Sequence, residues 1–261
     1  MKKKPMLILL PALILIIFIA AYFVLHEKTQ NKNISVLISQ VETLTAEVKE
    51  LSSRSNREKK EPKVWGDGYN WMAIGNSLTW IESCGRGICS TKPDNDYFGL
   101  VKAWLENKYD SVQAERCNYS NWEQSTLRSS MYDLIEPYLS EKLDLVTIQL
   151  GENVPYADTY GEDLIQLIRY VREKCPDAEV ILIDDFWNQE MSDIRRMAAM
   201  ETKTAFADLT EIRNKKEYQS MEGIEYVLPD GSTGKVTKEE ETHPGDAGMA
   251  YIAEQLIKIL R

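Results

Sequence analysis

The chain has 261 residues and a formal net charge of −10, because its 41 acidic residues outnumber its 31 basic residues. From residue 63 onward, 35 acidic and 21 basic residues leave a net charge of about −14. Nucleic-acid binding needs a basic surface that neutralises phosphates, so nucleic acid is excluded as an expected partner. The balance favours a neutral glycan or a small ester over a polyanion as the substrate.

The N-terminal segment has the pattern of a membrane anchor. Three lysines at positions 2–4 precede residues 5–25, which carry no charge and are mostly Leu, Ile, Ala and Phe. This length fits a bilayer-spanning helix and exceeds the apolar region of a usual signal peptide. We therefore predict a cytoplasmic tail at 1–4, a transmembrane helix at 5–25 and an extracytoplasmic remainder, giving a single-pass protein of the cell membrane. A cleaved signal peptide is the alternative, since Ala20-Ala21 fits a cleavage site.

Residues 31–54 show a heptad pattern that predicts a coiled-coil stalk. β-Branched residues occupy one core position and leucines the other, namely Ile34, Val41 and Val48 with Leu37, Leu44 and Leu51. This choice favours a parallel two-stranded coil, hence a homodimer. So short a coil is marginal alone, but tethering in one membrane raises its effective concentration. A single amphipathic stalk helix is the alternative. Residues 55–64 are predicted as a linker.

Residues 65–261 are enough for one domain with a substantial core, and its predicted strands and helices alternate. Strands are expected at 70–74, 112–118, 143–150, 180–184 and 204–209, and helices at 97–109, 123–139, 160–174, 190–203 and 245–260. A small hairpin is expected to turn at Asp230-Gly231. Strands separated by helices predict a parallel sheet covered on both faces, a flavodoxin-like three-layer α/β/α fold.

All four cysteines, Cys84, Cys89, Cys117 and Cys175, lie in the predicted external domain. An even number outside the cytoplasm indicates disulfides, and Cys84 and Cys89 could close a short loop. Buried thiols remain the alternative for Cys117 and Cys175. Metal binding is not expected, because no histidine or CxxC pair accompanies them. No cofactor is expected either.

Three short motifs indicate nucleophilic chemistry. Gly75-Asn76-Ser77-Leu78 follows a predicted strand, Gly151-Glu152-Asn153 follows another, and Thr242-His243-Pro244 precedes the last helix. Open α/β sheets keep their chemistry at the carboxyl ends of the strands. A serine needs a base to accept its proton, and His26 lies at the membrane edge, so His243 is the only histidine that the domain offers.

These motifs, in this order, resemble those of the SGNH/GDSL hydrolases, a family of esterases and acyl-transfer enzymes. The resemblance covers roughly residues 65–261, with Asn76 where Asp is usual. It implies Ser77 as the nucleophile and His243 as the base. It also implies an acid three residues before the histidine, which is Glu240 here. A Ser-His dyad with a backbone carbonyl holding the imidazole is the alternative, and Asp184 and Asp185 are further candidates for supporting carboxylates.

The resemblance implies an oxyanion hole built from the Ser77 N–H, the Asn153 amide and a glycine N–H after the second strand. The corresponding stretch, 117–123, contains no glycine. Asn118 or Asn121 could take the unusual backbone instead, and Asn118 is the candidate donor. Asn153 could alternatively be a helix cap or a turn residue.

Three aromatic residues, Trp122, Tyr156 and Trp187, follow strands or motifs at the same edge. We expect them to offer platforms for sugar rings, although loop aromatics also serve as packing residues.

The expected function is a membrane-anchored extracytoplasmic serine esterase that releases small acyl groups, acetyl in the first instance, from carbohydrate. The reaction would pass through an acyl-enzyme. The same site could act as an O-acyltransferase on surface polysaccharide. A hypothesis of another class is a catalytically degenerate glycan-binding or scaffolding module.

Overall fold

The computed structural model describes residues 61–155 and 157–261. The predicted tail, transmembrane helix and stalk, at 1–4, 5–25 and 31–54, lie outside the described residues, as does most of the predicted linker. Within the described residues, no helix has the length and apolar character needed to cross a membrane.

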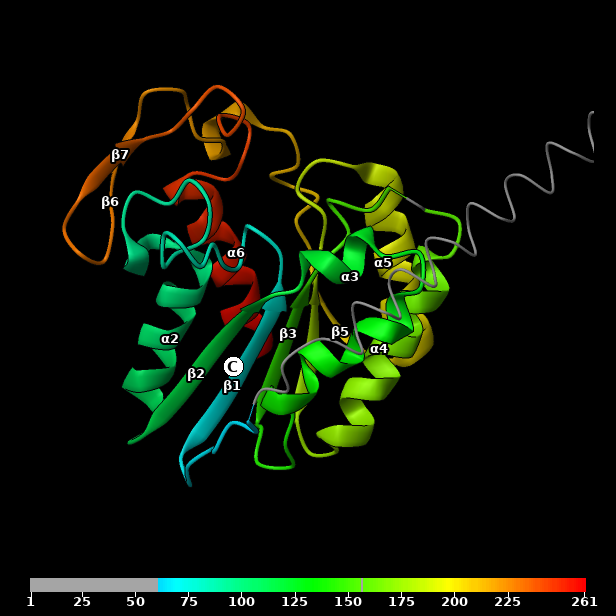
Figure 1. The fold of residues 1–261 in the computed structure, drawn as a ribbon. Helices are drawn as coiled ribbons and strands as arrows, with labels where there is room; N and C mark the ends of the chain where they lie inside the picture. The colour runs from blue at the N-terminus through cyan, green and yellow to red at the C-terminus, as the bar shows by residue number, and fades with distance from the viewer. Residues whose placement is uncertain (1–60, 156) are drawn as a thin grey trace, which may run out of the picture. The chain divides into compact units, whose positions relative to one another are not determined.

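The centre of the domain is a sheet of five parallel strands, shown in Figure 1. They are β1 (Tyr69–Gly75), β2 (Val112–Asn118), β3 (Leu145–Gln149), β4 (Glu179–Ile183) and β5 (Ala205–Ala207). The spatial order is β2-β1-β3-β4-β5, so the chain changes direction across the sheet between β1 and β3. Gly75 pairs with Asn118 on one side and Gln149 on the other, so the carboxyl ends of these strands are level. Such a switch point is where open α/β sheets bind ligands.

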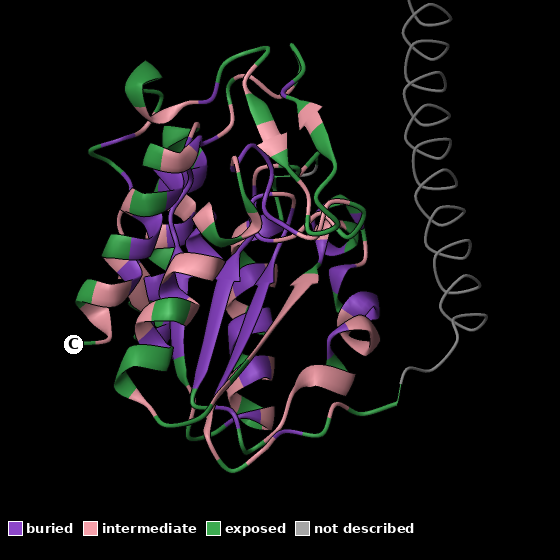
Figure 2. Cartoon of the chain, turned by 90° about the vertical axis from the view of Figure 1, so that its left-hand side faces the viewer, coloured by how far each residue is buried: buried purple, intermediate pink, exposed green. Residues whose placement is uncertain are grey.

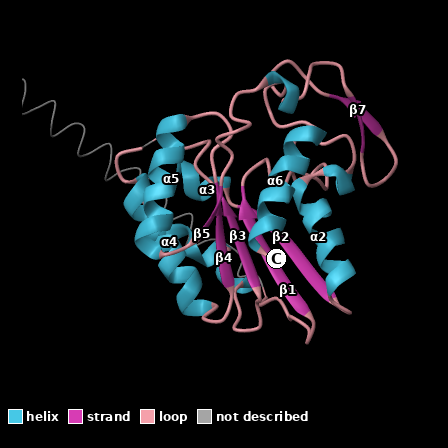
Figure 3. Ribbon diagram, turned by 180° about the vertical axis from the view of Figure 1, so that it is seen from behind, coloured by secondary structure: helices cyan, strands magenta, loops and turns pink. Residues whose placement is uncertain are grey.

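Helices cover both faces of the sheet, as Figures 1 and 3 show, which confirms the predicted layers. One face packs against α2 (Tyr97–Lys108) and α6 (Asp246–Ile259). The other packs against α3 (Ser120–Gln124), α4 (Tyr160–Lys174) and α5 (Gln189–Thr202).

The alternation of side chains along each strand builds a separate core on each face. Trp71 and Ala73 of β1 join the core under α2 and α6, while Met72 and Ile74 join the core under α4 and α5. β3 is buried along its whole length, as expected for a parallel strand covered on both faces. Figure 2 shows buried strands, in purple, at the centre of the domain. The two cores hold the strand ends rigidly in register.

The helix predicted at 123–139 is wrong. The chain forms α3 and then two 3₁₀ helices, η2 (Arg128–Leu134) and η3 (Glu136–Tyr138). The Ser125 hydroxyl accepts a hydrogen bond from Leu127 N at 2.9 Å, and such local bonds compete with helical ones. Pro137 adds a second interruption, because proline lacks the N–H that a helix interior needs.

The predicted hairpin is confirmed. β6 (Glu225–Val227) and β7 (Thr233–Lys235) pair antiparallel, and Gly231 in their turn has φ +83°. Two further 3₁₀ helices are η1 (Pro93–Asn95) and η4 (Lys216–Tyr218). In Figure 1 the hairpin lies at the end of the domain to which the β1 arrow points.

The predicted disulfides are not present: each of the four cysteines, all of which lie in the described ranges, is a thiol. Cys89 Sγ donates to the carbonyl of Glu240 at 3.3 Å, whereas Cys84 Sγ lies 3.8 Å from the hydroxyl of Ser83. Cys84 and Cys89, which were expected to form a disulfide, therefore contact different partners.

Candidate active site

Ser77 lies in a tight turn directly after β1. The carbonyl of Asn76 accepts from Thr79 N at 3.0 Å, and its side-chain oxygen accepts from Leu78 N at 3.1 Å. A Cβ on Gly75 would overlap the side chain of Thr79, so the turn requires glycine there. Asn76 is buried and Ser77 is half-buried, so the serine is accessible on a rigid support.

His243 lies in the loop before α6, with its imidazole held on one side. Nδ1 lies 2.9 Å from the carbonyl oxygen of Glu240, so it carries the proton of that hydrogen bond. No hydrogen bond engages Nε2 among the described residues. The ring of Trp187 stands edge-on to the imidazole at 5.2 Å between centroids, and Trp187 Nε1 donates to the Thr242 carbonyl at 2.9 Å. Burial lowers the pKa of His243, so a neutral imidazole is favoured.

The Glu240 carboxylate has a partner other than the imidazole. It accepts a hydrogen bond from Thr237 N at 2.8 Å, so Glu240 contributes its backbone carbonyl rather than its side chain. Asp184 instead accepts from Leu209 N at 3.0 Å and from Arg213 at 2.7 Å.

Asp185 is also engaged elsewhere. Its Oδ1 accepts from the backbone N–H groups of Trp187 and Asn188, each at 2.7 Å. In the described part of the chain, none of the three proposed carboxylates hydrogen-bonds to His243. The group that holds the imidazole is the backbone carbonyl of Glu240.

Residues 88 and 89 connect the serine turn with the histidine loop. Ile88 N donates to the Ser77 carbonyl at 2.8 Å, and Cys89 Sγ donates to the carbonyl that holds His243. Cys89 has φ +62°, a backbone conformation uncommon for residues other than glycine. Ser77 and His243 are not themselves joined by a hydrogen bond in the described structure. Such catalytic bonds often tighten only with substrate.

The oxyanion candidates have different surroundings. Asn153 Nδ2 donates to Glu123 Oε2 at 2.8 Å and is close to the carboxyl end of β3. Asn118 is exposed, its Oδ1 accepts from Ser120 N at 3.0 Å, and its Nδ2 donates to the Trp80 carbonyl. Among the described non-glycine residues with positive φ, neither Asn118 nor Asn121 occurs. The left-handed conformation expected of them is therefore not adopted.

A buried polar network that the sequence did not reveal lies beneath these motifs. Asn76 Nδ2 donates to Glu123 Oε1 at 3.1 Å and to Glu152 Oε2 at 2.7 Å. Gln149 Nε2 also donates to Glu152 Oε2, at 2.8 Å. Arg195 lies 2.8 Å from Glu152 Oε1 and 3.1 Å from Asp185 Oδ2. Desolvation raises the pKa of Glu152 to about 7, against the opposing charge of Arg195.

The three aromatic residues predicted to bind sugar have different settings. Trp122 is fully buried, and its ring packs between those of Tyr119 and Tyr160, so the predicted exposed platform at Trp122 is wrong. Tyr156 lies outside the described residues. Trp187 is half-buried and lines a cavity.

That cavity measures about 380 Å³ and opens at the carboxyl ends of β3 and β4. Its lining combines motif residues, carboxylates and apolar side chains, namely Gly151, Glu152, Val154, Ala157, Asp185, Trp187, Asn188, Glu190 and Met191. Since Trp187 contacts both this cavity and His243, the cavity adjoins the candidate base.

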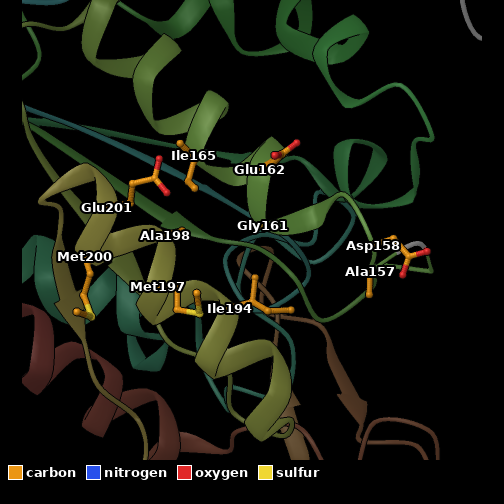
Figure 4. A pocket seen from close by; sticks show the side chains of 10 residues that line it. All are labelled: Ala157, Asp158, Gly161, Glu162, Ile165, Ile194, Met197, Ala198, Met200 and Glu201. Atoms are coloured by element: carbon orange, nitrogen blue, oxygen red, sulfur yellow. The ribbon is translucent and has the colours of Figure 1, made fainter.

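A second, larger groove of about 490 Å³ lies between α4 and α5 (Figure 4). Its floor is apolar, with Ile165 and Ile194, and the side chains of Met197 and Met200 are exposed at it. None of the three motifs lines this groove, so the cavity beside Trp187 is the candidate substrate site.

No protein-family profile matches the chain, and no curated protein matches its sequence. Solved structures do. The acetylxylan esterase Axe2 from Geobacillus stearothermophilus aligns with a TM-score of 0.50 and 19% identity, over 74% of this chain and 94% of its own. The described domain shares the fold of this esterase.

Two further matches are a phospholipase A1 from Streptomyces albidoflavus and a two-domain esterase active on acetylated mannans. The phospholipase has a TM-score of 0.48 and 14% identity, over 73% of this chain and 99% of its own. The mannan esterase has a TM-score of 0.48 and 17% identity, over 74% of this chain. The match spans about half of that esterase, 49% of its length.

Proposed function

We propose that the chain is a serine esterase that removes small acyl groups, acetyl above all, from carbohydrate. The observation that carries this proposal is the setting of His243. Its Nδ1 is held by a carbonyl, its pKa is lowered by burial, and its loop is tied to the Ser77 turn through residues 88 and 89.

The reaction would proceed in two acyl-transfer steps. Ser77 Oγ attacks the ester carbonyl carbon while His243 Nε2 takes the hydroxyl proton. The tetrahedral intermediate places its negative oxygen on the Ser77 N–H and the Asn153 amide. It then collapses, and the imidazolium returns the proton to the departing sugar oxygen. Water repeats these steps on the acyl-enzyme, releasing the carboxylic acid and restoring Ser77.

The cavity beside Trp187 suits the sugar part of such a substrate. An indole face offers a platform for a sugar ring, and the polar groups of Asn188 and Glu190 can bond its hydroxyls. The Axe2 structure is that of an enzyme for acetylated xylan, and an acetylated glycan is the substrate class that we propose here.

We further propose that the domain acts outside the cytoplasm from the membrane anchor predicted at 5–25. The heptad pattern at 31–54 would pair two chains in parallel. Crosslinking of the full-length protein in membranes, followed by denaturing electrophoresis, tests this pairing.

The first test uses full-length protein in detergent, a chromogenic acetyl ester and a fluorophosphonate probe. Turnover and labelling should disappear in Ser77→Ala and collapse in His243→Ala. Ser83→Ala, which changes an exposed serine of the following loop, should retain both. Activity that survives in Ser77→Ala would refute the mechanism.

Two other outcomes identify the alternatives. Faster decay of the acyl-enzyme with an added oligosaccharide, together with an acylated sugar product, would identify an O-acyltransferase. Glycan binding by a folded protein that neither turns over esters nor labels at Ser77 would identify a binding module.

A further inference from the structure

Glu123 is a fully buried carboxylate in α3, in the segment that follows β2. Among the described residues, no salt bridge reaches its carboxylate. Four hydrogen-bond contacts hold it instead, from Asn76 Nδ2, Gly151 N, Asn153 N and Asn153 Nδ2. Burying a carboxylate is costly unless such donors replace water.

These donors come from two different turns. Asn76 belongs to the turn after β1, and Gly151 and Asn153 belong to the turn after β3. β1 and β3 are neighbours in the sheet at its switch point. Glu123, supplied by the segment after β2, therefore connects the serine turn to the turn that carries the candidate oxyanion donor.

The contact with Asn153 fixes which way its amide points. The amide nitrogen of Asn153, Nδ2, lies 2.8 Å from Glu123 Oε2 and donates to it, so the nitrogen end of the amide faces Glu123. That nitrogen has two N–H bonds. One is donated to Glu123, and no acceptor within residues 61–155 and 157–261 engages the other.

We infer that Glu123 is a positioning residue, whose buried carboxylate orients the Asn153 amide so that its second N–H meets the oxyanion. The inference rests on the proposed esterase function. Glu123 does not touch the reacting atoms and acts through Asn153 and the turn at Gly151.

The decisive variant is Glu123→Gln. It keeps the shape of the side chain but places an NH₂ group, itself a donor, against the N–H groups of Asn76, Gly151 and Asn153. We expect kcat to fall by roughly 10- to 100-fold with KM within about threefold, because the donor is misplaced in the transition state rather than lost from substrate binding. Glu123→Asp, which keeps the charge on a shorter arm, should lose less. If Glu123→Gln fails to fold, a lower kcat with a nearly unchanged KM in Glu123→Asp is the readout.

Thr147→Val is the matched control. Its hydroxyl accepts from Trp71 Nε1 at 3.1 Å in the buried part of β3, so the variant loses a buried hydrogen bond on the strand that leads to Gly151. It should lower the melting temperature and leave kcat unchanged. Equal falls of kcat in Thr147→Val and Glu123→Gln would overturn the inference, as would a kcat within threefold of wild type in Glu123→Gln.

A second readout needs no activity. In full-length protein labelled with ¹⁵N-asparagine, one Asn153 amide proton is bound to a carboxylate, so its two amide protons should be widely split. Asn153→Ala assigns the signal, and Glu123→Gln should collapse the splitting. A wild-type protein without the splitting would overturn the inference. A split signal in a protein without esterase activity would overturn the proposed function instead.

Discussion

The ring of Trp187 stands edge-on to the imidazole of His243, with 5.2 Å between the centroids and 82° between the planes. The indole also donates to the carbonyl of Thr242, the residue before the histidine. One side chain therefore buttresses the base and forms a wall of the cavity beside it.

Shortening Trp187 should impair both roles. Trp187→Ala loses the ring contact and one hydrogen bond, together worth about 1–3 kcal/mol, so kcat/KM should fall by roughly 5- to 150-fold. Trp187→Phe keeps an aromatic edge and should lose about tenfold or less. Steady-state kinetics on an acetyl ester and an acetylated oligosaccharide check this. Equal losses in the two variants would show that the ring contributes nothing.

Glu240→Gln should retain activity to within about tenfold, because the imidazole is held by the backbone carbonyl and Gln can still accept from Thr237 N. If the carboxylate oriented the base, the loss would be on the order of 10⁴-fold. Glu239→Gln, on the exposed neighbour, is the control. Comparing kcat of the two variants decides between a dyad and a triad.

The acid limb of kcat/KM should lie below pH 6.5. Burial lowers the pKa of His243 from that value, while the Glu240 carbonyl opposes the shift. The free enzyme therefore keeps its base neutral to lower pH than an exposed histidine would. Rates measured from pH 4.5 to 8.5 test this, with Trp187→Ala expected to move the inflection back up. A wild-type inflection at or above 6.5 would contradict the prediction.

Glu152 should make the folded protein less stable as the pH rises. Its folded-state pKa is raised from 4.5 to about 7, so the folded protein binds a proton that the unfolded chain releases between these values. The stabilisation is present in full below pH 4.5 and is lost as the pH rises to about 7, by at most about 1.4 kcal/mol per pH unit.

Urea unfolding at pH 5, 6 and 7 measures this dependence. His243 contributes with the other sign in part of the same range, so the comparison is with Glu152→Gln, which cannot ionise. The free energy of unfolding of wild type should fall with pH relative to that variant. Parallel curves would mean that Glu152 does not titrate in this range.

The layers of the fold follow from the sequence because their signals are local. The apolar spacing at 160–174 predicts helix α4 with its observed ends, and the continuous apolar run around β3 predicts a strand buried on both faces. The segment at 123–139 has helical spacing too. There, side-chain bonds such as that of Ser125 to Leu127 N, and a proline, override it.

The site is predictable only in part for the same reason. Ser77 and His243 stand out because short motifs surround them. Glu123 carries no local signal, since a glutamate in a short helix usually faces solvent. The disulfide predicted between Cys84 and Cys89 is wrong, because a short spacing in the sequence does not determine where two thiols point.

Both N–H groups and the oxygen of the Asn76 side-chain amide are hydrogen-bonded. Its two N–H groups serve two different buried glutamates, and its oxygen accepts from Leu78 N. An aspartate at 76 would have no amide N–H to give to either glutamate. Asn76→Asp would therefore remove both donated hydrogen bonds at once, and we expect it to destabilise the turn after β1.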